Sequence, residues 1–183
     1  DDLAADMYDW AAGALAAAGY QHYEISNWAL PGFRAKHNLG YWLNRPYLGV
    51  GPGAHSRLGS YRFWEVASPR AYISGVKRWE AACPAPFLDF AEAELGAVSP
   101  VAGQEYIGLD TACAETMILG LRLLDGMDLA EASAQAGADL ALRYQPQLQE
   151  LVGLGLLEQA NGRVRLTPAA YLIANQVFTR FVG

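Results

Sequence analysis

The chain has 183 residues, a formal net charge of −6 and 52% hydrophobic side chains. Its length allows one full domain or two small ones, each with its own buried core. The acidic balance argues against a general nucleic-acid binder, because such proteins hold phosphates with clustered Lys and Arg. No apolar run is long enough to span a membrane, so we expect no transmembrane segment.

Neither the cysteines nor the first residues indicate export. Cys83 and Cys113 stand far apart, and no metal-binding spacing surrounds either of them. We interpret both as small buried hydrophobes in a reducing cytoplasm. Asp1 and Asp2 open an acidic helix rather than a basic targeting segment, as if the chain were cut from a longer one.

The first third of the chain has an α/β pattern. Residues 3–18 are rich in alanine and place apolar side chains at helical spacing, and Gly19 ends this predicted helix. Residues 21–26 and 47–51 favour strands, the second of which leads into a glycine-rich turn. A helix, a strand, a loop and a strand in this order are typical of one edge of a parallel sheet.

The middle of the chain predicts one helix and a connection. Ser68 is a good cap and Pro69 a good first residue for a helix that runs to about Ala82. Residues 83–109 contain scattered Pro and Gly without a sustained period, so we expect a linker or a surface excursion there.

The last third predicts several short helices. Residues 111–124 are apolar nearly all round, and Gly126 ends this helix. The capping box formed by Asp128 and Glu131 opens the next helix, which stops at Gly137.

A further helix, a hairpin and a last helix follow. The helix over residues 139–152 is expected to kink at Pro146, because proline lacks the N–H and clashes with the preceding turn. Residues 157–166 alternate around an Asn-Gly pair, which predicts a hairpin. A Thr-Pro pair then opens a helix predicted to bury Leu172, Ile173, Val177, Phe178 and Phe181. This order of elements indicates a winged helix.

Many winged helices bind DNA, but the charges here argue against it. The would-be recognition helix over residues 139–153 has one cation against two acids, and the hairpin adds only Arg163 and Arg165. Phosphate contacts supply much of the affinity for DNA and need more cations than these. We therefore expect a structural or partner-docking module and no nucleic-acid partner.

Residues 20–57 combine aromatics, glycines, cations and all three histidines. Residues 20–62 carry one acid, Glu24, against five cations, namely Arg34, Lys36, Arg45, Arg57 and Arg62. A basic island in an acidic protein favours an anionic ligand, although cations scattered over a solvated surface remain the alternative.

The histidines leave alternatives open. His37 in its loop beside Tyr41 and Trp42 can ligate a metal through one ring nitrogen while the aromatic rings pack against a macrocycle. The alternative, which the local residues slightly favour, is a His37 hydrogen-bonded within its loop while the two aromatics fill core space. His22 is expected to pack or cap, and the role of His55 stays open.

The segment GVGPGAHS contains Gly49, Gly51, Gly53 and Ala54. Backbone without Cβ atoms can approach a ligand closely and offer its N–H groups to a polar edge. Tight turns more often use glycine for steric reasons alone, so this signal is weak by itself.

Nearly the whole chain resembles the second half of the HemW-type heme chaperones, which belong to the radical-SAM family of oxygen-independent coproporphyrinogen III oxidases. The resemblance rests on five segments in the family's order, namely GYQHYEISNWA, HNLGYW, YLGVGPGAHS, ETMILGLRLLDG and LTPAAYLIANQVFTRF. It implies an α/β plus α fold. Residues 1–66 would be the carboxyl-terminal part of an incomplete (β/α) barrel, residues 67–109 a helix and linker, and residues 110–183 a winged-helix-like domain.

The resemblance also implies site residues. The histidine of the family's HN-x-x-YW motif is implicated in heme binding, which carries onto His37 as a candidate axial ligand of the heme iron. The proposed heme-binding set is His37, Tyr41, Trp42, Arg34, Lys36 and Arg45, the cations being partners for the propionates. The family's glycine turn lies near the S-adenosylmethionine and substrate pocket, which carries onto Gly49, Gly51, Gly53 and Ala54.

Two features separate the possibilities within the family. The true oxidases resemble RNFQGYTT where this chain has HNLGYW, which favours the chaperone branch. The family's CxxxCxxC motif is absent, and soft thiolate ligands are obligatory for a [4Fe–4S] cluster. We expect the cluster and S-adenosylmethionine only in a full-length parent, and the sequence leaves open whether that parent is an enzyme.

The sequence therefore predicts a fragment of a heme chaperone that binds and delivers heme. Its expected partners are heme or porphyrin, heme-accepting apoproteins and the missing amino-terminal barrel half. Its expected location is the cytoplasm, with a peripheral position at the inner membrane as an alternative. The other hypotheses are part of a true radical-SAM coproporphyrinogen III oxidase in porphyrin biosynthesis, and a winged-helix module for protein interaction.

Overall fold

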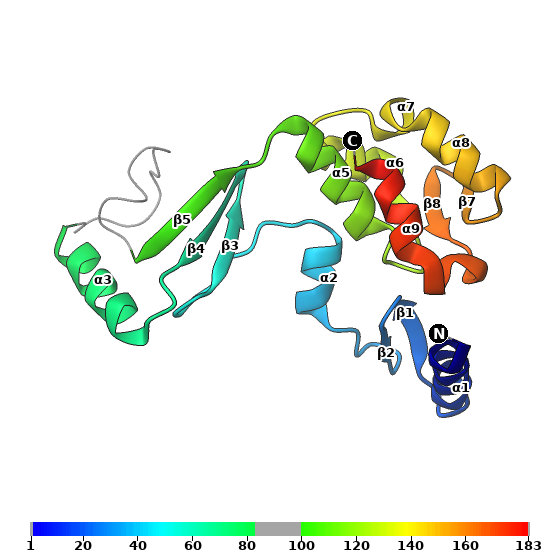
Figure 1. The fold of residues 1–183 in the computed structure, drawn as a ribbon, viewed down its shortest axis with the longest axis horizontal. Helices are drawn as coiled ribbons and strands as arrows, with labels where there is room; N and C mark the ends of the chain where they lie inside the picture. Colours follow the sequence, from blue (N-terminus) through cyan, green and yellow to red (C-terminus); the bar gives the residue numbers. More distant parts are fainter. Residues whose placement is uncertain (1, 83–99, 183) are drawn as a thin grey trace. The chain divides into compact units, whose positions relative to one another are not determined.

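The computed structural model describes residues 2–82 and 100–182, and the chain divides into two compact units (Figure 1). Unit 1 comprises Asp1–Arg45 and Leu109–Gly183, and unit 2 comprises Pro46–Gly108. The predicted domain boundaries near residues 66 and 109 divide the chain differently and stay a prediction.

Unit 1 begins with the predicted helix. Helix α1 spans Asp2–Ala17, and the strands β1 (Gln21–Glu24) and β2 (Asn27–Ala29) follow as an antiparallel hairpin. The predicted strand over residues 21–26 is thus confirmed in its first four residues. All strand ladders within the described residues are antiparallel, so the expected parallel edge is not found in that part of the chain.

The expected loop around His37 is wrong, because Lys36–Trp42 form a helix, α2. A helix of seven residues is too short to be stable by itself in water. Tertiary contacts support its carboxyl end. The side chain of Asn44 donates to Thr116 Oγ1 at 2.9 Å, and Gln135 Nε2 donates to the Asn44 carbonyl.

Helix α5 spans Leu109–Gly120 and ends earlier than the predicted residue 124. The next residues leave the helix to bond with the β1 hairpin. The N–H of Ile25 donates to the Arg122 carbonyl, and the N–H of Leu124 donates to the Tyr23 carbonyl, each at 3.2 Å. This long-range pairing replaces helical hydrogen bonds, which local sequence does not reveal.

The next three helices confirm the capping and proline signals. Helix α6 spans Leu129–Ala136; Asp128 Oδ1 accepts the N–H groups of Ala130 and Glu131, and Gly137 follows with φ 77°. Helices α7 (Leu140–Arg143) and α8 (Gln145–Gly153) confirm a break near Pro146. The proline stands at the start of α8, where its missing N–H needs no partner.

The hairpin is confirmed and the last helix is only partly confirmed. Strands β6 (Met127–Asp128), β7 (Leu157–Ala160) and β8 (Arg163–Leu166) form a sheet of order β6-β8-β7. The final segment divides into η1 (Pro168–Ile173), α9 (Ala174–Phe178) and η2 (Thr179–Phe181). Leu172, predicted to be buried, is exposed, because the tighter 3₁₀ turns of η1 bury Ala170 instead.

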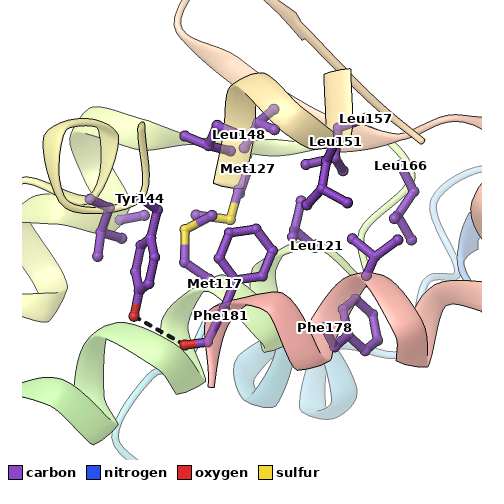
Figure 2. Packing of buried hydrophobic residues seen from close by; sticks show 14 of the residues in the cluster. Met117, Leu121, Met127, Tyr144, Leu148, Leu151, Leu157, Leu166, Phe178 and Phe181 are labelled. Atoms are coloured by element: carbon purple, nitrogen blue, oxygen red, sulfur yellow. Dashed lines mark hydrogen bonds between the residues drawn. The ribbon is translucent and has the colours of Figure 1, made fainter. Parts of the chain in front are cut away.

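The core of unit 1 lies among the helices and sheet of residues 109–183. Figure 2 shows Met117 and Leu121 from the α5 region facing Phe178 and Phe181 from the last segment. Tyr144 closes one end, and its hydroxyl donates to the Phe181 carbonyl at 3.4 Å. The side chain of Met127 lies over Gly120, where an added Cβ would be 2.5 Å from its sulfur.

The described part of unit 2 has a three-stranded antiparallel sheet, and helix α3 lies between its second and third strands in the chain. Strands β3 (His55–Leu58), β4 (Tyr61–Glu65) and β5 (Val101–Tyr106) pair in the order β3-β4-β5 (Figure 1). Helix α3 spans Pro69–Ala82 as predicted, and Ser68 Oγ accepts the N–H of Ala71 at 3.4 Å.

Two predictions for unit 2 are wrong. Residues 47–51 form no strand; Tyr47 alone makes a bridge, with Arg57, while the strand begins at His55. Part of the predicted linker is β5, which pairs along β4. The rest of that linker, residues 83–99 with Cys83, lies outside the described residues.

Within the described part of the chain, no helix is both long and apolar enough to cross a membrane.

Candidate functional site

The predicted site residues fall into two groups. The proposed heme-binding residues belong to unit 1, on and beside α2, and the glycine turn belongs to unit 2.

His37 is the second residue of α2, and its side chain is exposed. The Tyr41 ring lies one turn further along and meets the imidazole edge-on, with ring centres 4.7 Å apart and planes at 80°. Among the described residues, no hydrogen bond engages the His37 ring, so both ring nitrogens are accessible to a ligand. His37 is thus neither in a loop nor held there by a hydrogen bond.

Trp42 lies on another face of the same helix. At 100° per residue, Leu39, Trp42 and Leu43 project from the side of α2 opposite to His37 and Tyr41. These three residues line a hollow of about 280 Å³ that α2 shares with the end of α5 and with α6. The structure therefore brings Tyr41, but not Trp42, beside His37.

The hollow carries balanced charge. Its lining includes three arginines, Arg34, Arg45 and Arg163, and three acids, Asp125, Asp128 and Glu131. Pockets that enclose a drug-sized ligand measure about 300–1,000 Å³, so this hollow would take part of a larger molecule rather than a whole macrocycle. Its mixture of charges does not favour anions in general.

The cations of the predicted set differ in what surrounds them. Arg34 Nη1 pairs with Asp125 Oδ2 at 2.5 Å and lies 5.6 Å from the centre of the Tyr23 ring. Lys36 and Arg45 are exposed, and neither has an ion-pair partner within the described residues. The guanidinium of Arg34 is therefore already engaged by Asp125 and Tyr23, whereas Lys36 and Arg45 are available to a ligand.

Sequence reasoning missed a buried ion pair behind α2. The Glu24 side chain is 0% exposed; its Oε1 accepts the Ser26 N–H at 3.1 Å and the Asn27 amide, and its Oε2 accepts Arg122 Nη2 at 3.3 Å. Arg122 Cζ lies 4.3 Å from the centre of the Trp42 ring. In the sequence, Glu24 stands in a short β-prone stretch and Arg122 in a segment expected to be an apolar helix, but nothing there pairs the two residues.

His22 packs, as expected. Its ring stacks on Trp28 with centres 4.1 Å apart and planes at 10°, and Tyr8 and Tyr171 approach it edge-on or tilted. The Tyr8 hydroxyl donates to the Ile25 carbonyl at 3.0 Å. Burial, followed by the nearby charges of Tyr171, Glu24 and Asp9, raises the pKa of Tyr8 to about 12.

The N–H groups of the glycine turn already have partners within unit 2. Gly49 donates to Ser56 Oγ at 3.0 Å, Gly51 to the Tyr72 hydroxyl at 3.2 Å and Gly53 to the Val66 carbonyl at 3.0 Å. The N–H of Ala54 donates to the Gly51 carbonyl at 3.1 Å.

Steric demand explains two of these glycines. A Cβ at Gly49 would lie 2.2 Å from the His55 carbonyl oxygen, and Gly51 has φ 113°. This geometry favours a steric role for the turn, and the cofactor role stays a prediction. His55 is exposed, with its ring 6.0 Å from that of Trp64 and tilted by 29°.

Among residues 2–82 and 100–182, no three His, Cys, Asp or Glu side chains converge as metal ligands. Cys113 is a free, buried cysteine in the core of unit 1, as the sequence predicts.

The comparisons with known proteins first define a domain. The family described as the HemN C-terminal domain matches residues 108–173. The solved structure reported as "Coproporphyrinogen III oxidase (HemN) from Escherichia coli is a Radical SAM enzyme" covers 97% of this chain and 40% of its own. Its TM-score is 0.63 at 16% identity, so this likeness shows the fold alone.

The whole chain is similar to heme chaperones. Heme chaperone HemW of Mycobacterium tuberculosis is 34% identical over 183 residues, all of this chain and 40% of that protein. Heme chaperone HemW of Lactococcus lactis is 30% identical over 182 residues, covering 100% of this chain and 43% of the relative. The chain spans about two fifths of the length of these curated relatives. The resemblance to the HemW-type, HemN-like radical-SAM family is confirmed.

Proposed function

We propose that the chain is the heme-binding part of a heme chaperone, with His37 as the axial ligand of the heme iron. The observation that carries the proposal is the exposed imidazole on α2, whose ring nitrogens have no hydrogen-bond partner among the described residues. The similarity to proteins named heme chaperone HemW supports the choice of ligand.

The residues around His37 fit this role. A bound heme supplies an iron that accepts an imidazole nitrogen. The Tyr41 ring, edge-on to the imidazole, limits its rotation and offers an apolar wall to the macrocycle. Lys36, the first residue of α2, and Arg45, just after the helix, are the available cations for the two propionates. Arg34 and Trp42 remain in the proposed set, but their role is to hold α2 in place rather than to contact the heme.

We also propose how the two parts of the chain correspond to the fold of the longer relatives. Residues 1–66 would be the closing part of an incomplete (β/α) barrel, and the exposed apolar residues of α1 support a missing partner there. Residues 110–183 would be a winged-helix-like domain, supported by the helices α5, α6 and α8 and the β7–β8 hairpin. The [4Fe–4S] cluster and S-adenosylmethionine, with Gly49, Gly51, Gly53 and Ala54 near them, are proposed for the longer parent only.

Heme-accepting apoproteins are the proposed partners, together with the barrel half that the longer relatives contain. A cytoplasmic location, or a peripheral one at the inner membrane, is proposed with them. A coproporphyrinogen III oxidase parent is the second hypothesis; the fold likeness to HemN is compatible with it, but at 16% identity this likeness concerns the fold alone. An interaction module remains the third.

Heme titration of residues 1–183 tests the role of His37. We expect His37→Ala to lower heme affinity at least about tenfold and to change the Soret band, because it removes the imidazole ligand. His55→Ala is the matched control, since His55 is also exposed beside an aromatic ring. Equal heme affinities and spectra for wild type and His37→Ala would remove His37 from the site.

A further inference from the structure

Three segments that are far apart in the sequence meet at one contact in unit 1. Glu24 comes from YEISN, Trp42 from HNLGYW and Arg122 from LGLR. Arg122 bonds to Glu24, and its Cζ lies over the Trp42 ring, 4.3 Å from the ring centre. We propose that Arg122 is a positioning residue, which sets the orientation of α2, and so of His37, through its stack on Trp42. This inference rests on the proposed function, because it concerns the helix that carries the iron-ligand candidate.

Glu24 holds the guanidinium in place. The turn between β1 and β2 fixes the carboxylate, since the Ser26 N–H and the Asn27 amide both donate to Oε1. Oε2 is left for Arg122 Nη2, at 3.3 Å. A fully buried carboxylate without a cation is strongly unfavourable, so the pair is maintained whenever the hairpin is folded.

The stack gives α2 a second point of attachment. The first is Asn44, whose side chain donates to Thr116 just beyond the end of the helix. A short helix attached at one end can still rotate about its own axis. Trp42 lies within the helix, so the contact with Arg122 fixes that rotation. His37 projects from the opposite face, and any rotation would redirect its imidazole.

The shape of the guanidinium matters more than its charge here. Arg122 Nε and Trp42 Nε1 are both buried and have no hydrogen-bond partner within the described residues. Neither of these atoms supplies a hydrogen bond in the described part of the chain, so the contact between the two side chains is a cation–π contact. A lysine at position 122 keeps a charge for Glu24 but lacks the planar guanidinium that stacks on aromatic rings.

The test compares Arg122→Lys with Arg165→Lys in the chain of residues 1–183. Arg165 also pairs with a glutamate, Glu158, but in the exposed β7–β8 hairpin. The first readout is the indole N–H resonance of Trp42, which Trp42→Phe assigns among the five tryptophans. We expect Arg122→Lys to shift this resonance and the His37 ring signals, and Arg165→Lys to leave both unchanged.

Heme affinity, measured on variants that remain folded, is the second readout. We expect Arg122→Lys and Trp42→Leu each to weaken heme binding about tenfold, with folded far-UV spectra, the order expected for a partly desolvated cation–π contact. The double variant should be no weaker than either single variant, because both remove the same contact. Additive losses would show that Arg122 does not act through Trp42 and would overturn the proposal.

The two proposals fail in different ways. If wild type binds no heme, or binds it equally well without the His37 side chain, the proposed function is wrong. The Trp42 and His37 resonances still decide whether Arg122 orients α2. If those resonances are the same in Arg122→Lys and Arg165→Lys, the positioning role is wrong even when heme binds to His37.

Discussion

Residues 109–183 and residues 1–45 belong to the same compact unit, but they are stabilised differently. All nineteen residues of the main buried apolar cluster come from residues 109–183. Helix α1, by contrast, has no buried residue, and Leu3, Met7 and Trp10 are 71%, 63% and 76% exposed. Apolar spacing in a sequence therefore indicates a helix, but it does not say whether the chain itself supplies what covers the apolar face.

The first segment is held mainly where it contacts the second. Its buried residues are Tyr23, Glu24, Ala29 and Asn44. Backbone bonds from Tyr23 and Ile25 reach the turn after α5, and Asn44 reaches Thr116. The ligand candidate His37 lies between these attachments in the chain. The geometry of the site therefore depends on the contacts between the two segments, which we call the joint.

The largest expected loss of stability comes from a substitution in the core of residues 109–183. Leu140→Ala should lower the free energy of unfolding by about 2–5 kcal/mol, because Leu140 is fully buried and its truncation leaves a cavity. Leu142→Ala is the matched control, in the same short helix but 71% exposed, with an expected change within about 0.5 kcal/mol. Urea unfolding followed by circular dichroism measures both.

Urea unfolding of Leu3→Ala in α1 tests whether the first segment is less tightly packed than the second. We expect a change as small as that of Leu142→Ala, because Leu3 is also exposed. A loss comparable with that of Leu140→Ala would contradict the difference between the two segments.

An intermediate effect is expected at the joint. Glu24→Gln should cost about 1.5–3 kcal/mol of unfolding free energy, because it removes a buried charge that Arg122 pairs with. Glu158→Gln is the control, since its pair with Arg165 is about half exposed and worth less than about 1 kcal/mol. Equal losses for the two variants would mean that the joint is no more stabilising than a surface ion pair.

Local signals in the sequence predicted much of the second segment. The N-cap at Asp128, the break near Pro146 and the Asn161-Gly162 turn are each decided by neighbouring residues, and each is confirmed. The end of α5 was misplaced because residues after Gly120 bond to the distant β1 hairpin. The tighter turns of η1 were missed for a similar reason, since Thr167 Oγ1 donates to the Gly155 carbonyl instead of capping the helix.

The candidate site was less predictable. The residue types on α2 pointed to His37, Tyr41 and the nearby cations, but the helix itself exists through contacts with α5 and α6. Because side chains leave a helix at about 100° per residue, Trp42 and His37 lie on different faces of α2. The loop that the sequence suggested imposes no such separation. The Glu24–Arg122 pair joins residues almost a hundred positions apart, and a single sequence contains no signal for such a pairing.

A smaller loss than that of Glu24→Gln is expected at the hydrogen bond between α1 and the hairpin, and it depends on pH. The Tyr8 hydroxyl donates to the Ile25 carbonyl, and burial raises the pKa of Tyr8 from 10.0 to about 12. Between these two values the unfolded chain loses the phenol proton while the folded chain keeps it. The contribution of Tyr8 to stability is therefore fully present below pH 10 and declines as the pH rises toward 12.

Tyr8→Phe isolates this contribution. Below pH 10 the variant should be less stable than wild type by about 0.5–1.5 kcal/mol, the usual net contribution of one hydrogen bond. The difference should shrink between pH 10 and 12, because only wild type has a phenol there to titrate. Urea unfolding of both proteins at several pH values from 9 to 12 measures it. A difference that stays constant over this range would mean that the pKa of Tyr8 is the same in the folded chain as in the unfolded one.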